Sequence, residues 1–356
     1  MTSSRREVGR ALDRRRGTWR PPDTWLLRRF GLAGPIVLTG LACLSLLSRD
    51  TAADAGTLPL LIGLLIGLPH GAVDHLVPAW QCATVRPLRA TIGLLLAYAG
   101  AAAATVALFL WMPVPVLAGF LILTVLHFGA GDVAYRAERD GQPPAGSVLA
   151  VLAYGGPPVV LPAALWPGTV DPLLDAVAPG ASAAFTPAGR MVALSAVLLA
   201  AVVTGLRELA AHRGDEVAAL GVLVAAFALV PPPLAFGAYF AAWHSARHVA
   251  RLLHADPGNQ HHLAAGRLDE PLRRFARQAA LPTVGACAGL LALLYGSGAT
   301  STASATTAGP FAADSLQVIF AVLAGLTVPH AAVVARLDRR TAARPQCPAA
   351  WPGRGS

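Results

Sequence analysis

Residues 57–79 read TLPLLIGLLIGLPHGAVDHLVPA, an apolar run with two histidines and one aspartate in its second half. About 20 apolar helical residues cross the roughly 30 Å hydrocarbon core of a bilayer, because each residue adds about 1.5 Å. The run is therefore long enough to span a membrane. His70, Asp74 and His75 would then lie within the membrane, where ionisable side chains are costly and usually mark a functional interior.

The rest of the chain has the same apolar character. Of its 356 residues, 55% are hydrophobic and 13% are charged, and the mean hydropathy is +0.55. This composition predicts an all-α, polytopic transmembrane helix bundle with about 10 spans. The expected spans are 31–48, 57–79, 90–112, 114–134, 146–165, 190–206, 217–231, 234–254, 279–296 and 314–335.

The formal charge of +9 comes from arginines that lie between the apolar runs or near the N-terminus. They form no single basic face, so nucleic acid is not an expected partner. Alternating the loops from a cytoplasmic N-terminus places 24 of the 28 arginines in the cytoplasm, with Arg49 and Arg190 outside and Arg247 and Arg251 within a span. This bias predicts a multi-pass protein of the cell membrane with both termini cytoplasmic.

Three regions follow from this map. We expect a basic, disordered cytoplasmic tail at 1–30, a transmembrane catalytic bundle at 31–336 and a second cytoplasmic tail at 337–356. A cleaved signal peptide is the alternative for the basic start and the apolar run that follows it. The four cysteines form no CxxC pair, which argues against a disulfide framework or a thiolate metal site: Cys43, Cys82, Cys287 and Cys347.

Six of the ten histidines fall inside expected spans. All six lie on spans predicted to run from outside to inside, about five to ten residues from the cytoplasmic end, and hence within ~8–15 Å of that boundary. One layer of the bundle could hold them all. They are His70, His75, His127, His244, His248 and His330.

His244 and His248 are four residues apart, which on an α-helix places both rings on one face and lets them chelate one metal. A single membrane histidine is more often a hydrogen-bonding residue, but six at one depth favour a metal site. Asp74 and Asp132 are placed to orient ligating imidazoles. The equal alternative is that these aspartates pair with Arg247 or Arg251 in a structural network.

Imidazole ligation without thiolates suits iron, copper, zinc or nickel. A site at membrane depth would meet apolar substrates and oxygen, which favours iron-dependent oxygenation of a lipid, although spacing alone leaves zinc open.

Four strings also resemble the Brp/Blh family of membrane β-carotene 15,15'-dioxygenases. They occur in the family's order, and the resemblance runs from about residue 57 to 335. The strings are GLPHGAVDH at 67–75, HFGAGD at 127–132, WHSARH at 243–248 and TVPH at 327–330.

The resemblance implies an enzyme that uses O2 and non-haem Fe(II) to split the central double bond of β-carotene into two molecules of all-trans-retinal. Its iron ligands would correspond to His70, His127, His244 and His248. It implies that His75 and His330 line the pocket, or that His330 is an extra ligand. Its partners would be the lipid bilayer, β-carotene, O2 and a retinal-binding opsin.

Under this hypothesis the aromatic residues beside the ligands line a substrate tunnel, although simple helix packing is the more common role of such residues. They are Phe128, Tyr239, Phe240 and Trp243. The basic tail, the Ala-rich segments and the loop at 166–189 depart from the family's pattern and leave substrate choice and regulation open.

Three other functions are weighed against this one. A di-iron desaturase or hydroxylase would need about eight histidines with an HxxHH box, which is absent here. A metal or proton transporter would string its histidines across the bilayer and accompany them with carboxylates. A structural or assembly factor would need no catalytic site.

Overall fold

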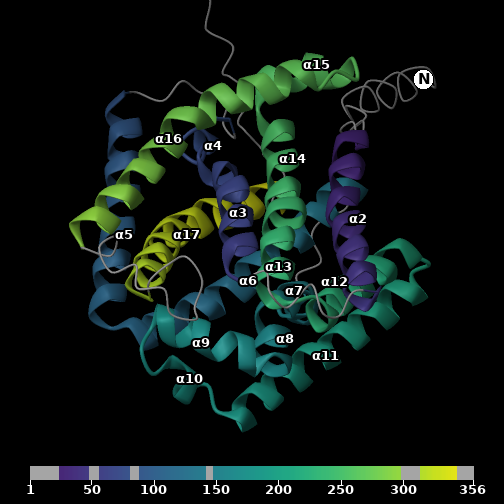
Figure 1. The fold of residues 1–356 in the computed structure, drawn as a ribbon. Helices are drawn as coiled ribbons and strands as arrows, with labels where there is room; N and C mark the ends of the chain where they lie inside the picture. The colour runs from purple at the N-terminus through teal and green to yellow at the C-terminus, as the bar shows by residue number, and fades with distance from the viewer. Residues whose placement is uncertain (1–23, 48–55, 81–87, 142–146, 298–312, 343–356) are drawn as a thin grey trace, which may run out of the picture.

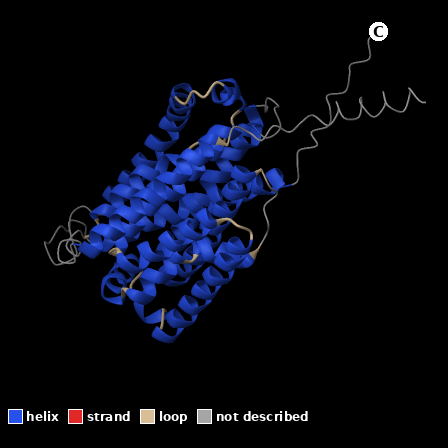
Figure 2. Cartoon of the chain, turned by 90° about the vertical axis from the view of Figure 1, so that its right-hand side faces the viewer, coloured by secondary structure: helices blue, strands red, loops and turns tan. Residues whose placement is uncertain are grey.

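The computed structural model describes residues 24–47, 56–80, 88–141, 147–297 and 313–342 (Figure 1). Within these ranges every regular element is a helix, which confirms the all-α prediction (Figure 2). In chain order the elements are α2 (Trp25–Leu47), α3 (Leu58–Gly67), η2 (Leu68–Gly71), α4 (Val77–Trp80), α5 (Leu88–Trp111), α6 (Pro113–Asp140), α7 (Val148–Gly155), α8 (Pro157–Leu165), α9 (Pro167–Val177), α10 (Ala181–Ala184), α11 (Pro187–Ala210), α12 (Gly214–Leu229), α13 (Pro232–Ala238), η3 (Tyr239–Ser245), α14 (Ala246–Ala255), η4 (Pro257–Asn259), α15 (Gln260–Ala264), α16 (Asp269–Gly296) and α17 (Ala313–Ala342).

Six helices are long and apolar enough to cross a membrane: α2, α5, α6, α11, α16 and α17. The pair α7 and α8, bent by 56° at the Gly–Pro junction, makes a seventh if it is one broken span. The other expected spans, 57–79, 217–231 and 234–254, coincide with shorter or interrupted helices. The count of ten and the cytoplasmic placement of the termini therefore stay predictions.

The outward faces of these helices are apolar. Ile36, Leu96, Val192 and Leu281 each leave more than half of their surface exposed. Side chains of this kind are stable on a surface that lipid covers, and their spread over four helices fits a bundle surrounded by hydrocarbon.

The helices extend beyond the expected boundaries at both ends of the bundle. α2 begins at Trp25, before residue 31, because Leu26 and Leu27 are fully buried and the Trp25 indole donates to the Leu263 carbonyl at 3.3 Å. α17 continues past residue 336 to Ala342. Most of the two predicted tails, 1–23 and 343–356, lies outside the described residues.

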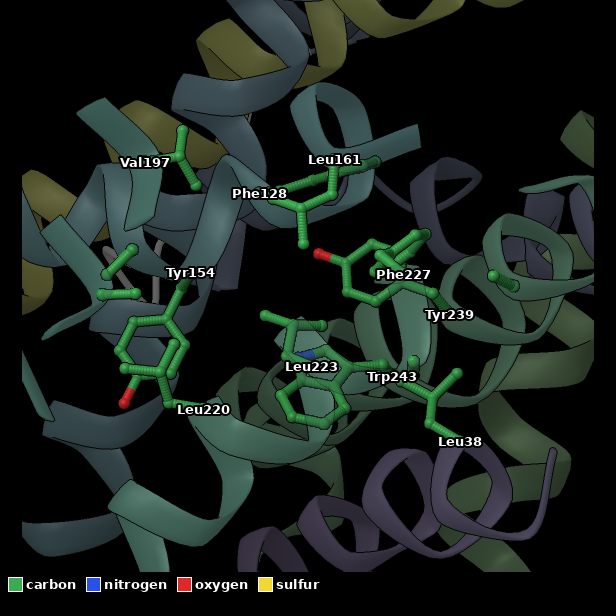
Figure 3. Close-up of a cluster of buried hydrophobic side chains, with 14 of the residues drawn as sticks. Leu38, Phe128, Tyr154, Leu161, Val197, Leu220, Leu223, Phe227, Tyr239 and Trp243 are labelled. Carbon is green, nitrogen blue, oxygen red and sulfur yellow. The ribbon is translucent and has the colours of Figure 1, made fainter. Parts of the chain in front are cut away.

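One large apolar cluster joins α2, α6, α7, α8, α11, α12 and the segment around η3 (Figure 3). Its members include Leu38, Tyr154, Phe227 and Trp243, each fully buried. Small residues bring the backbones together, since a Cβ at Gly155 would overlap the Val125 carbonyl oxygen of α6. Close contact at glycine is a common way for membrane helices to pack.

Buried ion pairs join the helices at one end of the bundle. Arg136 of α6 lies 2.6 Å from both Glu208 of α11 and Glu216 of α12. Arg251 of α14 lies 2.8 Å from Glu138 of α6 and 2.5 Å from Asp338 of α17. Because buried charges are stable only when paired, these contacts fix the relative positions of five helices.

Replacement of Gly155 by alanine tests the α6–α7 contact. We expect Gly155→Ala to lower stability by about 1–3 kcal/mol, because the added methyl group has no free space. The control is Gly119→Ala in α6, where nothing lies within 4 Å of the added Cβ. Thermal unfolding of the two detergent-solubilised variants measures the difference, and equal midpoints would contradict the close contact.

Candidate metal centre

Five buried histidines meet in the middle of the bundle, each from a different segment. His70 lies in the 3-10 turn η2, His127 in α6, His244 in η3, His248 in α14 and His330 in α17. Each side chain belongs to a residue that is 8% exposed or less. The sequence pattern expected six histidines in one layer, and the structure brings five of them into contact.

The five imidazoles form a closed ring, in which each ring lies beside two others. The centroid distances are 5.1 Å for His127–His244, 5.2 Å for His244–His70, 5.6 Å for His70–His248, 5.2 Å for His248–His330 and 5.0 Å for His330–His127. His70 and His330 also approach across the ring, at 4.9 Å. His330 therefore completes the ring, because it lies between His248 and His127, which have no ring contact with each other.

The helix that carries His244 and His248 is not a regular α-helix. Residues 239–245 form a π-helix, and α14 starts directly after it. The expectation of one α-helix through both residues needs correction, because His244 lies in the π-helical segment and only His248 lies in α14. The two rings still converge, since both contact His70. A single π-helical turn is a common way to redirect side chains at functional sites.

Hydrogen bonds orient two of the rings. His70 Nδ1 lies 2.6 Å from the Gly67 carbonyl oxygen, and His330 Nδ1 lies 2.8 Å from Asp74 Oδ2. Both partners are acceptors, so each Nδ1 carries the proton and each Nε2 keeps a free lone pair. This arrangement is typical of histidines that bind a metal through Nε2.

Three imidazole nitrogens of this cluster have no hydrogen-bond partner within the described part of the chain: Nε2 of His127, of His248 and of His330. An unsatisfied buried polar atom costs about 1–3 kcal/mol, so three in one cluster call for a ligand. A cation bound by neutral imidazoles would be such a ligand. Of these three histidines, His248 and His330 belong to the group, with Asp74, whose ligand atoms lie close enough for one ion, and His127 lies outside that group. The residues present therefore fit a metal.

Asp74 lies beside the ring of histidines and accepts hydrogen bonds from two side chains. Its Oδ2 accepts from His330 and, at 3.1 Å, from the hydroxyl of Tyr98 in α5. Asp74, His248 and His330 offer atoms within 4.8 Å of one another, which is close enough for a shared ion. Because Asp74 Oδ2 is already bonded to His330, we assign Asp74 as the acceptor that orients His330, not His70.

Asp132 has a different role from Asp74. It accepts from Arg247 at 2.8 Å and from the Trp243 indole at 2.9 Å, while the Arg247 guanidinium stacks 3.9 Å from the Trp243 ring. No hydrogen bond joins Asp132 to a histidine among the described residues. For Asp132 the alternative, pairing with Arg247 in a structural network, is the one observed.

Of the four aromatic residues predicted to line a tunnel, two pack on the histidines and two do not. Phe128 lies 4.4 Å from His244, and Phe240 lies 5.4 Å from His70, so both pack directly on the ring of histidines. Tyr239 is farther away, at 6.5 Å from His244. Trp243 bonds with Asp132 instead, and a Cβ on Gly34 of α2 would overlap it.

His75 is half-buried and makes no ring contact with the other five histidines in the described ranges. Its expected role in lining the pocket stays a prediction.

The sequence did not indicate two residues that lie beside the histidines, Tyr98 and Ser245. Ser245 Oγ lies 3.4 Å from His70 Nδ1. The available signal for Tyr98 was a phenol within an Ala- and Leu-rich membrane helix.

Comparisons with known proteins assign this arrangement to a family. A family model described as beta-carotene 15,15'-dioxygenase matches residues 61–338. The chain belongs to this family. A protein of Halobacterium salinarum described as "Probable beta-carotene 15,15'-dioxygenase Blh" is 34% identical over 301 residues, which cover 78% of this chain and 82% of that protein. No solved structure matches the chain.

Membership of the β-carotene 15,15'-dioxygenase family confirms the resemblance carried by the four strings and makes the chain a carotenoid-cleaving dioxygenase. It decides against the transporter, the desaturase and the assembly factor. Together with the buried His and Asp group, the family supports a metal cofactor.

Removal of the Asp74 carboxylate tests its role in the centre. We expect Asp74→Ala to weaken metal binding about 10–100-fold, because His330 loses the acceptor that orients it. Competition with a chelator, followed by metal analysis of the purified protein, measures the change. Asp215→Ala is the control, since that carboxylate is 70% exposed, and equal metal retention in both variants would contradict the assignment.

Proposed function

We propose that this chain uses Fe(II) and O2 to cleave the 15,15' double bond of β-carotene, giving two molecules of all-trans-retinal. The proposal is supported by the family and by the description of the Halobacterium salinarum relative. The reaction balances, because each atom of one O2 molecule becomes the aldehyde oxygen of one product. No side-chain acid or base is needed for this balance.

The observation that carries the proposal is the closed ring of five imidazoles, three of which have an unpartnered Nε2 atom. We assign His70, His127, His244 and His248 as ligands of Fe(II). His330 is a further ligand, because it closes the ring and its Nδ1 is held by Asp74. Neutral imidazoles bind iron as well as copper, zinc or nickel, and the dioxygenase reaction of the family favours iron over zinc, because zinc has no redox change.

When bound, Fe(II) supplies the one-electron chemistry that allows O2 to react with a polyene. The protein's own contribution is positioning and exclusion of water. Phe128 and Phe240 pack against the histidines and give the polyene an apolar surface beside the centre. The position of cleavage is then set by which double bond these apolar side chains hold next to the histidines.

The setting of this reaction is the cell membrane, where carotenoids are dissolved. The apolar outer faces of the helices support this location. A retinal-binding opsin as the acceptor of the product stays a prediction.

Removal of one ligand tests the assignment. In carotene-accumulating bacteria we expect the wild-type chain to bleach the orange colour and form retinal, and His244→Ala to lower retinal formation at least ~100-fold. His261→Ala, on the exposed helix α15, is the control and should bleach normally. Retinal formation by His244→Ala at the control level, with equal protein in the membrane, would contradict the ligand set.

The identity of the metal needs a separate measurement. We expect a strong chelator to abolish retinal formation by the purified protein, and Fe(II) but not Zn(II) to restore it, because zinc has no accessible redox change. Metal content is measured in each sample. Restoration by Zn(II) at equal occupancy would exclude iron as the required ion.

A further inference from the structure

An apolar groove lies between α5, α16 and α17, on the outer surface of the bundle. Its volume is about 160 Å³, it is partly open, and every residue that lines it is Ala, Gly, Val or Leu. In Figure 1 the three helices are neighbours, with α17 packed along α5 and in contact with α16. The lining includes Ala102, Val106, Gly289, Leu293, Gly325 and Leu326.

Some of the residues that line this groove lie on the same helix as His330. Leu326 precedes His330 by four residues on α17, a rise of about 6 Å, and Val322 in the same groove lies about 12 Å from His330 along the helix. Tyr98, one helical turn before Ala102 on α5, donates to the Leu326 carbonyl at 3.2 Å and to Asp74 at 3.1 Å. One half-buried phenol therefore connects the groove to the carboxylate that holds His330.

We propose that this groove binds one arm of the carotenoid and admits it laterally from the bilayer between α5 and α16. The proposal rests on the proposed function, since it concerns the substrate of that same centre. An apolar wall offers nothing to a polar ligand, and an elongated polyene whose middle reaches the histidines must extend 6–12 Å or more along a neighbouring helix.

The loose packing of α16 favours entry of the carotenoid from the side. Only 6% of the apolar 18-residue stretch of α16 is buried, against 39% of the corresponding stretch of α17. The bundle therefore holds α16 less tightly than the helix that carries His330. Small residues at Gly289 and Ala103 keep the space between the helices open. A Cβ built at Gly289 meets nothing within 4 Å, so a side chain added there starts without a clash.

The test is Gly289→Phe compared with Ala288→Phe. Ala286, Gly289, Leu290 and Leu293 lie on the groove face of α16, and at 100° per residue Ala288 is on nearly the opposite face, where it is exposed. Three readouts are needed: KM and kcat for β-carotene in nanodiscs, metal content, and the amount of β-carotene retained by metal-free protein.

We expect Gly289→Phe to raise KM about tenfold or more and to reduce retention of β-carotene in the same proportion, with wild-type metal content, while Ala288→Phe stays within about twofold of wild type. Equal KM and equal retention in the two variants would overturn the groove as the binding site.

Two other occupants have distinct signatures. If Gly289→Phe changes only the co-purified phospholipid, or only the oligomeric state, and leaves β-carotene retention unchanged, the polyene is excluded as the occupant. Failure of the proposed function is separable: wild-type protein that forms no retinal with Fe(II) refutes the reaction, whereas the retention measurement on metal-free protein still decides whether the groove binds the carotenoid.

Discussion

An imidazole nitrogen buried within a membrane must find a partner, because lipid supplies no hydrogen bond. The architecture around the histidines follows from this constraint. The Nδ1 atoms of His70 and His330 are satisfied by the Gly67 carbonyl and by Asp74, which fixes the orientation of both rings. The unpartnered Nε2 atoms of His248 and His330 belong, with Asp74, to a group whose ligand atoms lie close enough for one ion to satisfy them.

The surrounding charges form a separate structural layer. Arg247, Arg251 and Arg136 are all buried, and each is paired with carboxylates of other helices. These pairs hold α6, α14 and α17 in register just beyond the histidines, on the side of their C-terminal ends. The rigidity of the centre therefore depends on contacts that themselves bind no substrate and no metal.

The sequence predicted the helices and the gathering of histidines, since apolar length and the depth of a residue along a span are local properties. It could not predict which aspartate meets which partner, because Asp74–His330 joins residues 256 positions apart and depends on how helices rotate. It missed Tyr98 for the same reason. The π-helix at 239–245 could not be predicted from the sequence either. Such a segment depends on tertiary packing, here of Trp243 and Phe240 in the large apolar cluster, and not on local propensity.

The position of His330 on the last described helix has a consequence for biogenesis. The ring contains residues as far apart as His70 and His330, so it stays incomplete until α17 has entered the bilayer. At a synthesis rate of roughly 5–20 residues per second, ~10–50 s separate the emergence of these two histidines from the ribosome. Under the proposed ligand set, a nascent chain that lacks α17 would lack one ligand, and binding of the metal would be completed only after this helix has been made and inserted.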